Sequence, residues 1–297
     1  MKATRLISTY PLTYPAPPKP YDGPTFDLSG HQTSFDDLVS VSDADQRRSR
    51  PRPTSPPDSN TGGKLTNPST SDEISLDWLR LSGPTTMRHE AVKEIAQHLG
   101  NPTFGNGRYF LNSGYHFGAA AVYFDHDEDQ GKDHCVVDLP GSAMAEMGFR
   151  EAVDLLESLL CMGFRTTRLD IAVDLYQSAQ LIEQVTKSCL NGELCRAKKF
   201  RPMHVQSGAE LTGYGCNIGD RGKLGSGRYL RVYDKGLETK EQERGKWVRW
   251  EAELSGEPAQ VASMSLCEAD NMMTVALAHA FGVCDFRENT GDKHLDR

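Results

Sequence analysis

The chain has 297 residues, of which 37% are hydrophobic and 25% are charged, and its net charge is -8 at pH 7. This length allows one large or two small domains. The sequence has no signal-peptide pattern, no apolar run long enough to span a membrane, and no Cys-x-x-Cys pair among its seven cysteines. We therefore expect a soluble protein of a reducing cytoplasm, without a disulfide framework or a zinc ribbon.

The first 70 residues differ in composition from the rest of the chain. They hold eleven of the sixteen prolines, interleaved with Ser, Thr, Asp and Arg. Such a segment buries too little apolar surface to offset the entropy that it would lose on folding. The composition predicts a disordered Pro/Ser-rich tail over residues 1–70 and one folded domain over residues 71–297.

Hydrophobic spacing predicts the first elements of this domain. A strand is expected over Ile74–Leu81 and a helix over Pro84–Leu99. Two further strands, over Tyr115–Phe124 and His134–Leu139, are joined by an acidic loop.

The second half of the domain continues with helices and groups of strands. This arrangement predicts an α+β fold with a largely antiparallel β-sheet and helices packed on one face. The elements are helices over Phe149–Met162, Ser178–Leu190 and Ala259–Ala280, and strands over Thr167–Leu175, Arg228–Lys235 and Trp247–Leu254.

The three strands of this second half combine an apolar face with a polar one, because alternate side chains of a strand point to opposite faces. An ordinary half-buried sheet with a wet outer face would give the same alternation. Here, however, the polar faces are rich in carboxylates, arginines and tyrosines. They carry Arg168, Asp170 and Asp174 on the first strand, Tyr229, Arg231, Tyr233 and Lys235 on the second, and Arg249, Glu251 and Glu253 on the third.

The carboxylates of these faces indicate a cation site. Neighbouring carboxylates repel one another unless a cation lies between them. Their oxygen atoms suit a hard divalent ion such as Mg²⁺ or Mn²⁺, which polarises a phosphate during in-line displacement. The expected metal ligands are Asp170, Asp174, Glu251 and Glu253, and which three bind directly stays open.

Tyr233 is the candidate nucleophile beside this site. The expected metal ion, together with Arg231 and Lys235, would lower its pKa from about 10 and favour the phenolate. We therefore predict catalytic roles for Tyr233, Arg231 and Lys235. Tyr229 faces the same way and is the alternative nucleophile.

Three segments carry a resemblance to a known family. They run from Gly163 to Asp174, from Gly227 to Glu238, and from Trp250 to Glu253. In order and separation, they resemble the replication initiation factor family of plasmids and phages. Shorter matches at Leu76-Asp-Trp-Leu79 and Val136-Val-Asp-Leu-Pro-Gly141 extend the resemblance over roughly residues 74–253.

The resemblance implies a rolling-circle replication initiator of the type that lacks a His-hydrophobe-His motif. The nucleophile of the family maps onto Tyr233 within Arg231-Val-Tyr-Asp-Lys235, and its acidic partners map onto the four carboxylates. Such an enzyme nicks and rejoins one DNA strand at an origin through a covalent 5′-phosphotyrosine. The implied cofactor is Mg²⁺ or Mn²⁺. The implied partners are double- and single-stranded origin DNA, the replication helicase and polymerase of a bacterial host, and a second copy of the chain in a possible homodimer, without any membrane.

A basic stretch indicates where DNA would bind. From Arg196 to Arg249 the chain has thirteen Lys and Arg against six Asp and Glu, whereas the rest of the chain is acidic. This contrast favours a local nucleic-acid groove, although a solvated charged surface would look the same. We expect DNA to lie across the face that presents Tyr233. The predicted phosphate contacts are Lys198, Lys199, Arg201, Arg221, Lys223 and Arg228.

Other functions stay open at this point. A conjugative or mobilisation relaxase of the same family, or a DNA-binding regulator that keeps the scaffold without catalysis, would share these motifs. The loop flanked by His126 and His134 can in principle bind a metal, but a solvated connection is more common, and no His-x-His pair occurs. The glycines from Gly213 to Gly227 match no nucleotide-binding motif, and they favour a flexible hairpin that lets DNA approach the sheet.

Overall fold

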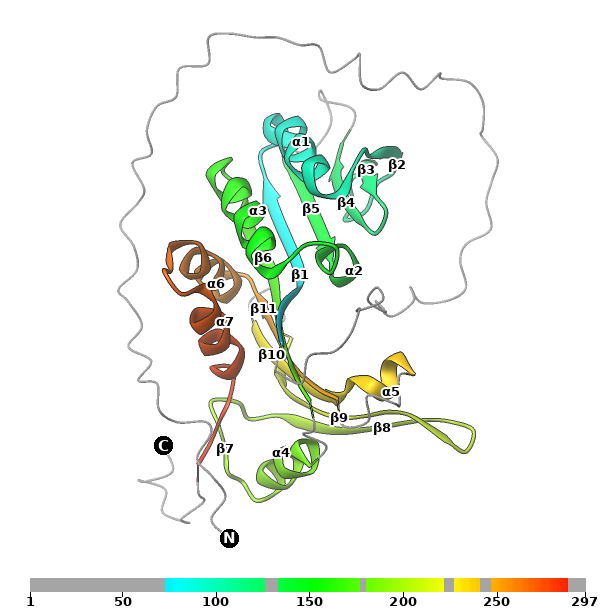
Figure 1. Cartoon of the computed structure of the whole chain (residues 1–297), viewed down its shortest axis with the longest axis vertical. Coiled ribbons are helices and arrows are strands. Elements are labelled where there is room, and N and C mark those ends of the chain that lie inside the picture. Colours follow the sequence, from blue (N-terminus) through cyan, green and yellow to red (C-terminus); the bar gives the residue numbers. More distant parts are fainter. Residues whose placement is uncertain (1–72, 126–132, 177–179, 222–226, 241–246, 288–297) are drawn as a thin grey trace. The chain divides into compact units, whose positions relative to one another are not determined.

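The computed structural model describes residues 73–125, 133–176, 180–221, 227–240 and 247–287. They form an α+β fold built on one large antiparallel sheet, as the sequence predicts (Figure 1). The expected tail over residues 1–70 lies outside the described residues. So do His126, Lys223 and Ser178, the first residue of the helix expected over Ser178–Leu190.

The large sheet has ten strands in the order β2-β3-β4-β5-β1-β6-β11-β10-β9-β8, and every neighbouring pair is antiparallel. Strands β7 and β12 pair separately. The strands are β1 (Glu73–Gly83), β2 (Thr103–Asn106), β3 (Ser113–Phe117), β4 (Ala120–Phe124), β5 (Cys135–Pro140), β6 (Arg165–Leu175), β7 (Leu194–Cys195), β8 (Phe200–Ser207), β9 (Glu210–Asp220), β10 (Gly227–Asp234), β11 (Val248–Ser255) and β12 (Asp285–Phe286).

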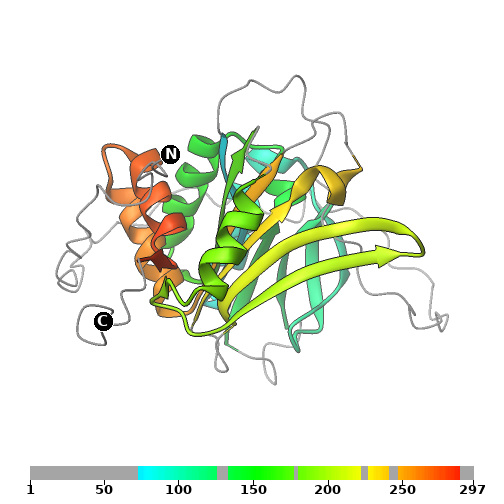
Figure 2. The ribbon, with the colours of Figure 1, turned by 90° about the horizontal axis from the view of Figure 1, so that it is seen from below.

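Helices cover one face of this sheet, with α3, α6 and α7 side by side over the central strands (Figures 1 and 2). None of the described helices is long and apolar enough to cross a membrane. The helices are α1 (Arg88–Leu99), α2 (Gly141–Met144), α3 (Phe149–Cys161), α4 (Leu181–Leu190), α5 (Lys235–Thr239), α6 (Glu257–Glu268) and α7 (Met272–Phe281), with a 3₁₀ turn over Thr85–Met87.

The core lies between the sheet and these helices. Leu169 and Ile171 of β6 and Leu230 of β10 are fully buried on the helix-covered face. Helix α3 buries Leu155, Leu156 and Leu159 in an apolar stripe, which is the reason it packs rather than staying in solvent. The alternation predicted for the three strands is therefore correct, and their other face is the polar one.

The structure differs from the sequence prediction at turns. The expected strand over Tyr115–Phe124 is the hairpin β3-β4, which turns at Gly118 with a φ of 62°. The expected helix over Ala259–Ala280 is divided into α6 and α7, because Ala269 is extended and Asn271 caps the second helix by accepting a hydrogen bond from the Thr274 backbone at 3.1 Å.

Candidate active site on the polar face of the central strands

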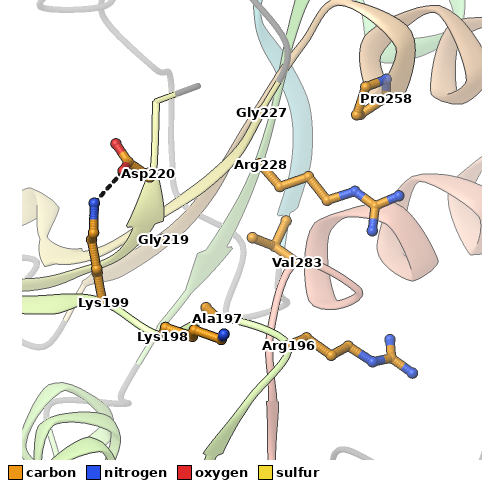
Figure 3. Close-up of a pocket in the computed structure, with 10 residues that line it drawn as sticks. All are labelled: Arg196, Ala197, Lys198, Lys199, Gly219, Asp220, Gly227, Arg228, Pro258 and Val283. Atoms are coloured by element: carbon orange, nitrogen blue, oxygen red, sulfur yellow. Dashed lines mark hydrogen bonds and ion pairs between the residues drawn. The ribbon is translucent and has the colours of Figure 1, made fainter. Parts of the chain in front are cut away.

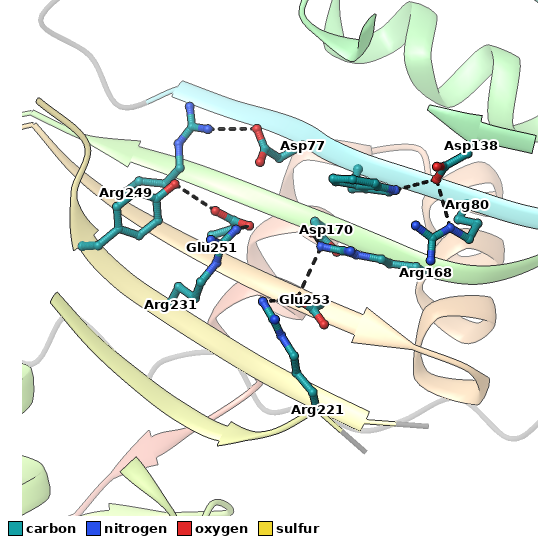
Figure 4. A network of polar contacts seen from close by, with 12 residues as sticks. Asp77, Arg80, Asp138, Arg168, Asp170, Arg221, Arg231, Arg249, Glu251 and Glu253 are labelled. Atoms are coloured by element: carbon teal, nitrogen blue, oxygen red, sulfur yellow. Dashed lines mark hydrogen bonds and ion pairs between the residues drawn. The ribbon is translucent and has the colours of Figure 1, made fainter. Parts of the chain in front are cut away.

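Cross-strand register brings the predicted site residues into one row of contacts. Tyr233 of β10 lies opposite Arg249 of β11, and Arg231 lies opposite Glu251. Directly opposed residues of antiparallel strands point to the same face. Figure 4 shows the resulting network of acids and arginines across β10, β11, β6 and β1.

Tyr233 is bonded to a carboxylate. Its hydroxyl donates a hydrogen bond to Oε2 of Glu251 over 3.0 Å, and the guanidinium of Arg231 pairs with the other oxygen of Glu251. Tyr233 is 7% exposed and Glu251 is 0% exposed. A charged acceptor that is ordered by an arginine is therefore already in place for the phenolic proton.

The surroundings of Tyr233 raise the pKa of its phenol. Burial and the neighbouring Glu251 raise the pKa of Tyr233 well above its usual value, against the opposing effect of Arg249 and Arg231. Burial alone would raise the pKa of Glu251 too, but Arg231 and Arg249 hold it below its usual value. These directions favour a neutral phenol beside an ionised carboxylate when no metal ion is bound. The expected lowering of the tyrosine pKa concerns the site with a metal ion bound and stays a prediction.

Asp170 and Glu253 form the next part of the site. They lie opposite each other on β6 and β11. Arg168 donates to both oxygens of Asp170 over 2.9 and 2.5 Å and approaches Glu253 at 3.4 Å. Arg221 lies 3.0 Å from the same oxygen of Glu253. Burial raises the pKa of Asp170 to about 7 despite Arg168, with Glu251 and Glu253 adding to the rise.

Asp174 belongs to a different group. Arg249 donates to both of its oxygens over 2.7 Å and to Oδ1 of Asp77 over 2.9 Å. Burial raises the pKa of Asp77 to about 6, although Arg249 opposes the rise. The sequence analysis did not identify Asp77 as a site residue. The only sign of it in the sequence was an acidic residue between Leu76 and Trp78. In the structure, the pairing of β1 with β6 shifts register at this point.

The geometry bears on the predicted metal ligands. Glu253 lies directly opposite Asp170, and both Glu251 and Glu253 are close enough to add to the rise in the pKa of Asp170 that burial causes. Asp174 is four residues along β6 from Asp170, or about 13 Å at the rise of an extended strand, which is too far for both to bind one ion. Each of the four pairs with an arginine, and the described residues contain no group of three or more His, Cys, Asp or Glu side chains that is placed to hold a metal ion.

Two other predicted site residues, Lys235 and Tyr229, lie near Tyr233 but do not share its contact with Glu251. Lys235 begins α5 rather than continuing β10, and its Nζ pairs with Glu238 at 2.5 Å while lying 5.8 Å from the Tyr233 ring centre. Tyr229 lies on the same face as Tyr233, opposite Glu253, with the Arg221 guanidinium 4.8 Å from its ring centre. Tyr229 is half-buried and stays an alternative nucleophile.

A second polar group on this face was not predicted. Asp138 of β5 accepts hydrogen bonds from Trp78 Nε1 over 2.8 Å, Arg80 Nε over 2.9 Å and the Tyr109 hydroxyl over 2.6 Å. The Arg80 guanidinium lies 4.4 Å from the Tyr109 ring centre, and that of Arg168 lies 4.3 Å from the Trp78 ring centre. These residues form a strip of stacked arginines and aromatic rings that reaches the Asp170 group.

The basic segment is divided between the two faces of the sheet. Arg201 shares the face of Arg231 through Asn217, and Arg221 reaches Glu253 on the same face. Arg228 instead lies opposite Leu254, a core residue, and therefore faces the helix side. The expectation that the whole segment contacts DNA on the face of Tyr233 is wrong for Arg228.

Lys198 and Lys199 precede β8 and line a pocket together with Arg228 (Figure 3). Lys199 pairs with Asp220 over 2.5 Å. Their position belongs to the helix side of the sheet rather than to the row that contains Tyr233.

Comparisons with known proteins agree with the fold. A family model described as replication initiation factor matches residues 164–295, which include Asp170, Tyr233, Glu251 and Glu253. The fold is similar to that of a rolling circle replication initiator protein from Geobacillus stearothermophilus, with a TM-score of 0.59 and 22% identity over 76% of this chain and 91% of that one. No curated protein sequence matches the chain. Residues 164–295 of this chain thus match the model of the replication initiation factor family, which agrees with the resemblance seen in the sequence.

Proposed function

We propose that this protein starts rolling-circle replication by nicking one DNA strand at an origin and later rejoining it, with Tyr233 as the nucleophile. The observation that carries the proposal is the hydrogen bond from the Tyr233 hydroxyl to Glu251 within a ring of arginines on the polar face of the sheet. The family match and the similarity in fold to a rolling circle initiator support it.

The proposed step is a transesterification. The Tyr233 oxygen attacks the phosphorus atom, the bond from phosphorus to the 3′ oxygen breaks, and a 5′-phosphotyrosine forms. Glu251 takes the phenolic proton, water protonates the leaving 3′ oxygen, and Glu251 then returns its proton to the hydroxide that forms, so no net proton is consumed. The phosphodiester is exchanged rather than hydrolysed. Reversal therefore reseals the strand without ATP.

The high pKa of Tyr233 makes a base necessary. A neutral phenol is a weak nucleophile, and general-base catalysis is typically worth about 10² to 10⁴ in rate. Glu251 is placed for this role at 3.0 Å. Arg231 and Arg249 oppose the rise in the tyrosine pKa, and Arg231 also orients the base. We propose a catalytic role for Arg231 on these contacts. For Lys235 we propose one through its positive charge near the Tyr233 ring.

We also propose that Asp170, Glu251 and Glu253 hold Mg²⁺ or Mn²⁺ when DNA is bound. A divalent ion there would polarise the scissile phosphate. The support is the position of Glu253 directly opposite Asp170, together with the contribution of Glu251 and Glu253 to the raised pKa of Asp170. Arg221, whose side chain is 57% exposed, can turn away from Glu253 to free an oxygen. Asp174 is left out because it lies too far along β6.

The polar face also suggests a path for the unpaired strand. Arg201 and Arg221 lie at the β8-β10 side, and the strip of Arg168, Trp78 and Tyr109 lies at the β1 side. Guanidinium and aromatic planes stack on nucleobases without strong sequence preference. We propose that single-stranded DNA crosses Tyr233 between these two groups.

One observation favours a second candidate, a non-catalytic regulator on the same scaffold. Tyr233 is only 7% exposed, so a phosphate reaches it only after side chains on the face move. A regulator would bind the same DNA without forming a covalent bond. Nicking activity therefore separates the two functions.

The test uses supercoiled plasmid that carries the origin, incubated with the protein and Mg²⁺ or Mn²⁺. The proposal predicts nicked circles with protein attached to the 5′ end, and their loss in Tyr233→Phe. Tyr229→Phe is the matched control on the same strand and face. Normal nicking by Tyr233→Phe, or none by the unaltered protein, would contradict the proposal.

A further inference from the structure

A pocket of about 420 Å³ lies on the side of the sheet opposite Tyr233. Figure 3 shows its walls, which come from the segment before β8, the end of β9, the start of β10, the first turn of α6 and the residue Val283 that follows α7. The lining residues are Arg196, Ala197, Lys198, Lys199, Gly219, Asp220, Gly227, Arg228, Pro258 and Val283.

The pocket has an excess of positive charge. Four lining residues are cations and one is an acid, Asp220, which pairs with Lys199 over 2.5 Å. Within the described ranges no acidic side chain pairs with Arg196, Lys198 or Arg228, and all three are exposed. Cations held close together repel one another, and an anion between them would offset that repulsion.

The backbone around the pocket takes unusual conformations. Arg196 has a φ of 63°, in the left-handed region that L residues other than glycine seldom adopt. Gly219 has a φ of 92°, and a Cβ there would lie 2.6 Å from the carbonyl oxygen of Arg228. Strained backbone of this kind concentrates at binding and catalytic sites. Here it brings two strands close and holds an arginine at the rim.

We propose that this pocket binds phosphate groups, and that the duplex arm of the origin supplies them while the unpaired strand lies on the opposite face. Arg196, Lys198 and Arg228 would contact the phosphate oxygens, and Pro258 and Val283 would lie against the adjoining sugar. The source of the phosphate rests on the proposed DNA-binding function, whereas the pocket itself is independent of the chemistry at Tyr233. A free nucleotide offers the same phosphate chemistry.

The experiment measures duplex DNA affinity against salt concentration in a background with both Tyr229→Phe and Tyr233→Phe, so that neither candidate nucleophile can nick the DNA and a wrong choice between them cannot affect the result. Neutralising Arg196 and Arg228 to Gln should flatten the slope of log affinity against log salt by about 1.8, or about 0.9 per phosphate contact. A second variant, Lys198→Gln with Lys199→Gln, removes two other charges of the pocket and leaves Arg196, the residue with the left-handed backbone, unchanged. Arg150→Gln with Lys187→Gln removes two exposed charges outside the pocket and should leave the slope nearly unchanged.

Inorganic pyrophosphate, titrated calorimetrically, separates the two sources. A flattened slope without pyrophosphate binding assigns the pocket to the DNA backbone. Pyrophosphate binding that both pocket variants lose and the control keeps assigns it to a free phosphate ligand. A slope equal to that of the control variant, together with no pyrophosphate binding, would overturn the proposal.

Discussion

At the residue scale, the surroundings of each carboxylate decide its role. Glu251 accepts hydrogen bonds from the Tyr233 hydroxyl and the Arg231 guanidinium. Asp170 and Glu253 both pair with Arg168, and Asp174 pairs with Arg249. The sequence places all of them on one face, yet their pairing depends on cross-strand register, which alternation within a strand does not specify. The acids were therefore predictable as a set and not one by one.

Asp170 gives a testable pH dependence. Its folded-state pKa of about 7 is above the unfolded value, so its contribution to stability is present at low pH and is lost as pH rises through about 7. We expect the free energy of unfolding of the protein to fall by about 2 kcal/mol more between pH 5 and pH 8 than that of Asp170→Asn. Urea unfolding at the two pH values measures this difference.

The matched control for this experiment is Asp154→Asn, an exposed substitution on α3 that should keep the full pH dependence. Parallel pH dependence in Asp170→Asn and the unaltered protein would show that Asp170 is ionised throughout this range. Asp170 would then not have the raised pKa that supports the proposed metal site of Asp170, Glu251 and Glu253.

At the scale of elements, the buried ion pair of Arg249 with Asp174, together with the half-buried Asp77, joins β11, β6 and β1. Arg249 bonds to both carboxylates, and Asp174 is its bidentate partner. This contact holds the strands that carry Glu251 and Asp170 in register. We therefore interpret Asp174 as a structural residue rather than a metal ligand.

The Asp174→Asn variant tests this interpretation. Removing one partner from a buried ion pair typically costs about 3 to 5 kcal/mol, so urea unfolding should show a loss of that order. The fraction that stays folded should still nick DNA at close to the normal rate. A stable variant that fails to nick would restore Asp174 to the metal site.

The turn between β2 and β3 presents an aromatic ring near the arginine strip. Tyr109 and Phe110 have φ values of 58° and 64°, and Phe110 is 96% exposed. If an unpaired base stacks there, Phe110→Ala should weaken single-stranded oligonucleotide binding about 5- to 150-fold, or about 1 to 3 kcal/mol per base. Fluorescence anisotropy with a labelled oligonucleotide measures this change.

Phe104→Ala is the control for that variant. Phe104 is 58% exposed but shares the helix-side face with Tyr115, Val122 and Val137. Its removal should leave oligonucleotide affinity nearly unchanged. Equal affinities for both variants would place the unpaired strand away from the β2-β3 turn.

At the scale of the whole molecule, fold class and sheet type could be predicted because periods of two and of 3.6 residues are local signals. The division of the basic segment between the two faces of the sheet could not be predicted, because Arg228 and Arg221 are close in sequence yet lie on opposite faces. A net charge of -8 hides this arrangement. DNA contact on both faces is the consequence that we propose.

The domain boundary is a prediction at the same scale. We expect a chain of residues 71–297 to unfold within about 2 °C of the full chain and to nick the same DNA, because the composition of residues 1–70 disfavours a packed core. Differential scanning calorimetry and the plasmid assay measure both. A fragment that fails to fold would show that the first 70 residues contribute to the core.

The identity of the attached residue tests the central claim most directly. After reaction with origin DNA and removal of the nucleic acid by nuclease, trypsin cuts after Arg228, Arg231 and Lys235 and so separates the two tyrosines. The account predicts a residual nucleotide on the peptide Val232-Tyr-Asp-Lys235, detected by mass spectrometry as an adduct on Tyr233. An adduct on Tyr229-Leu-Arg231, or attachment at any other residue, would contradict it.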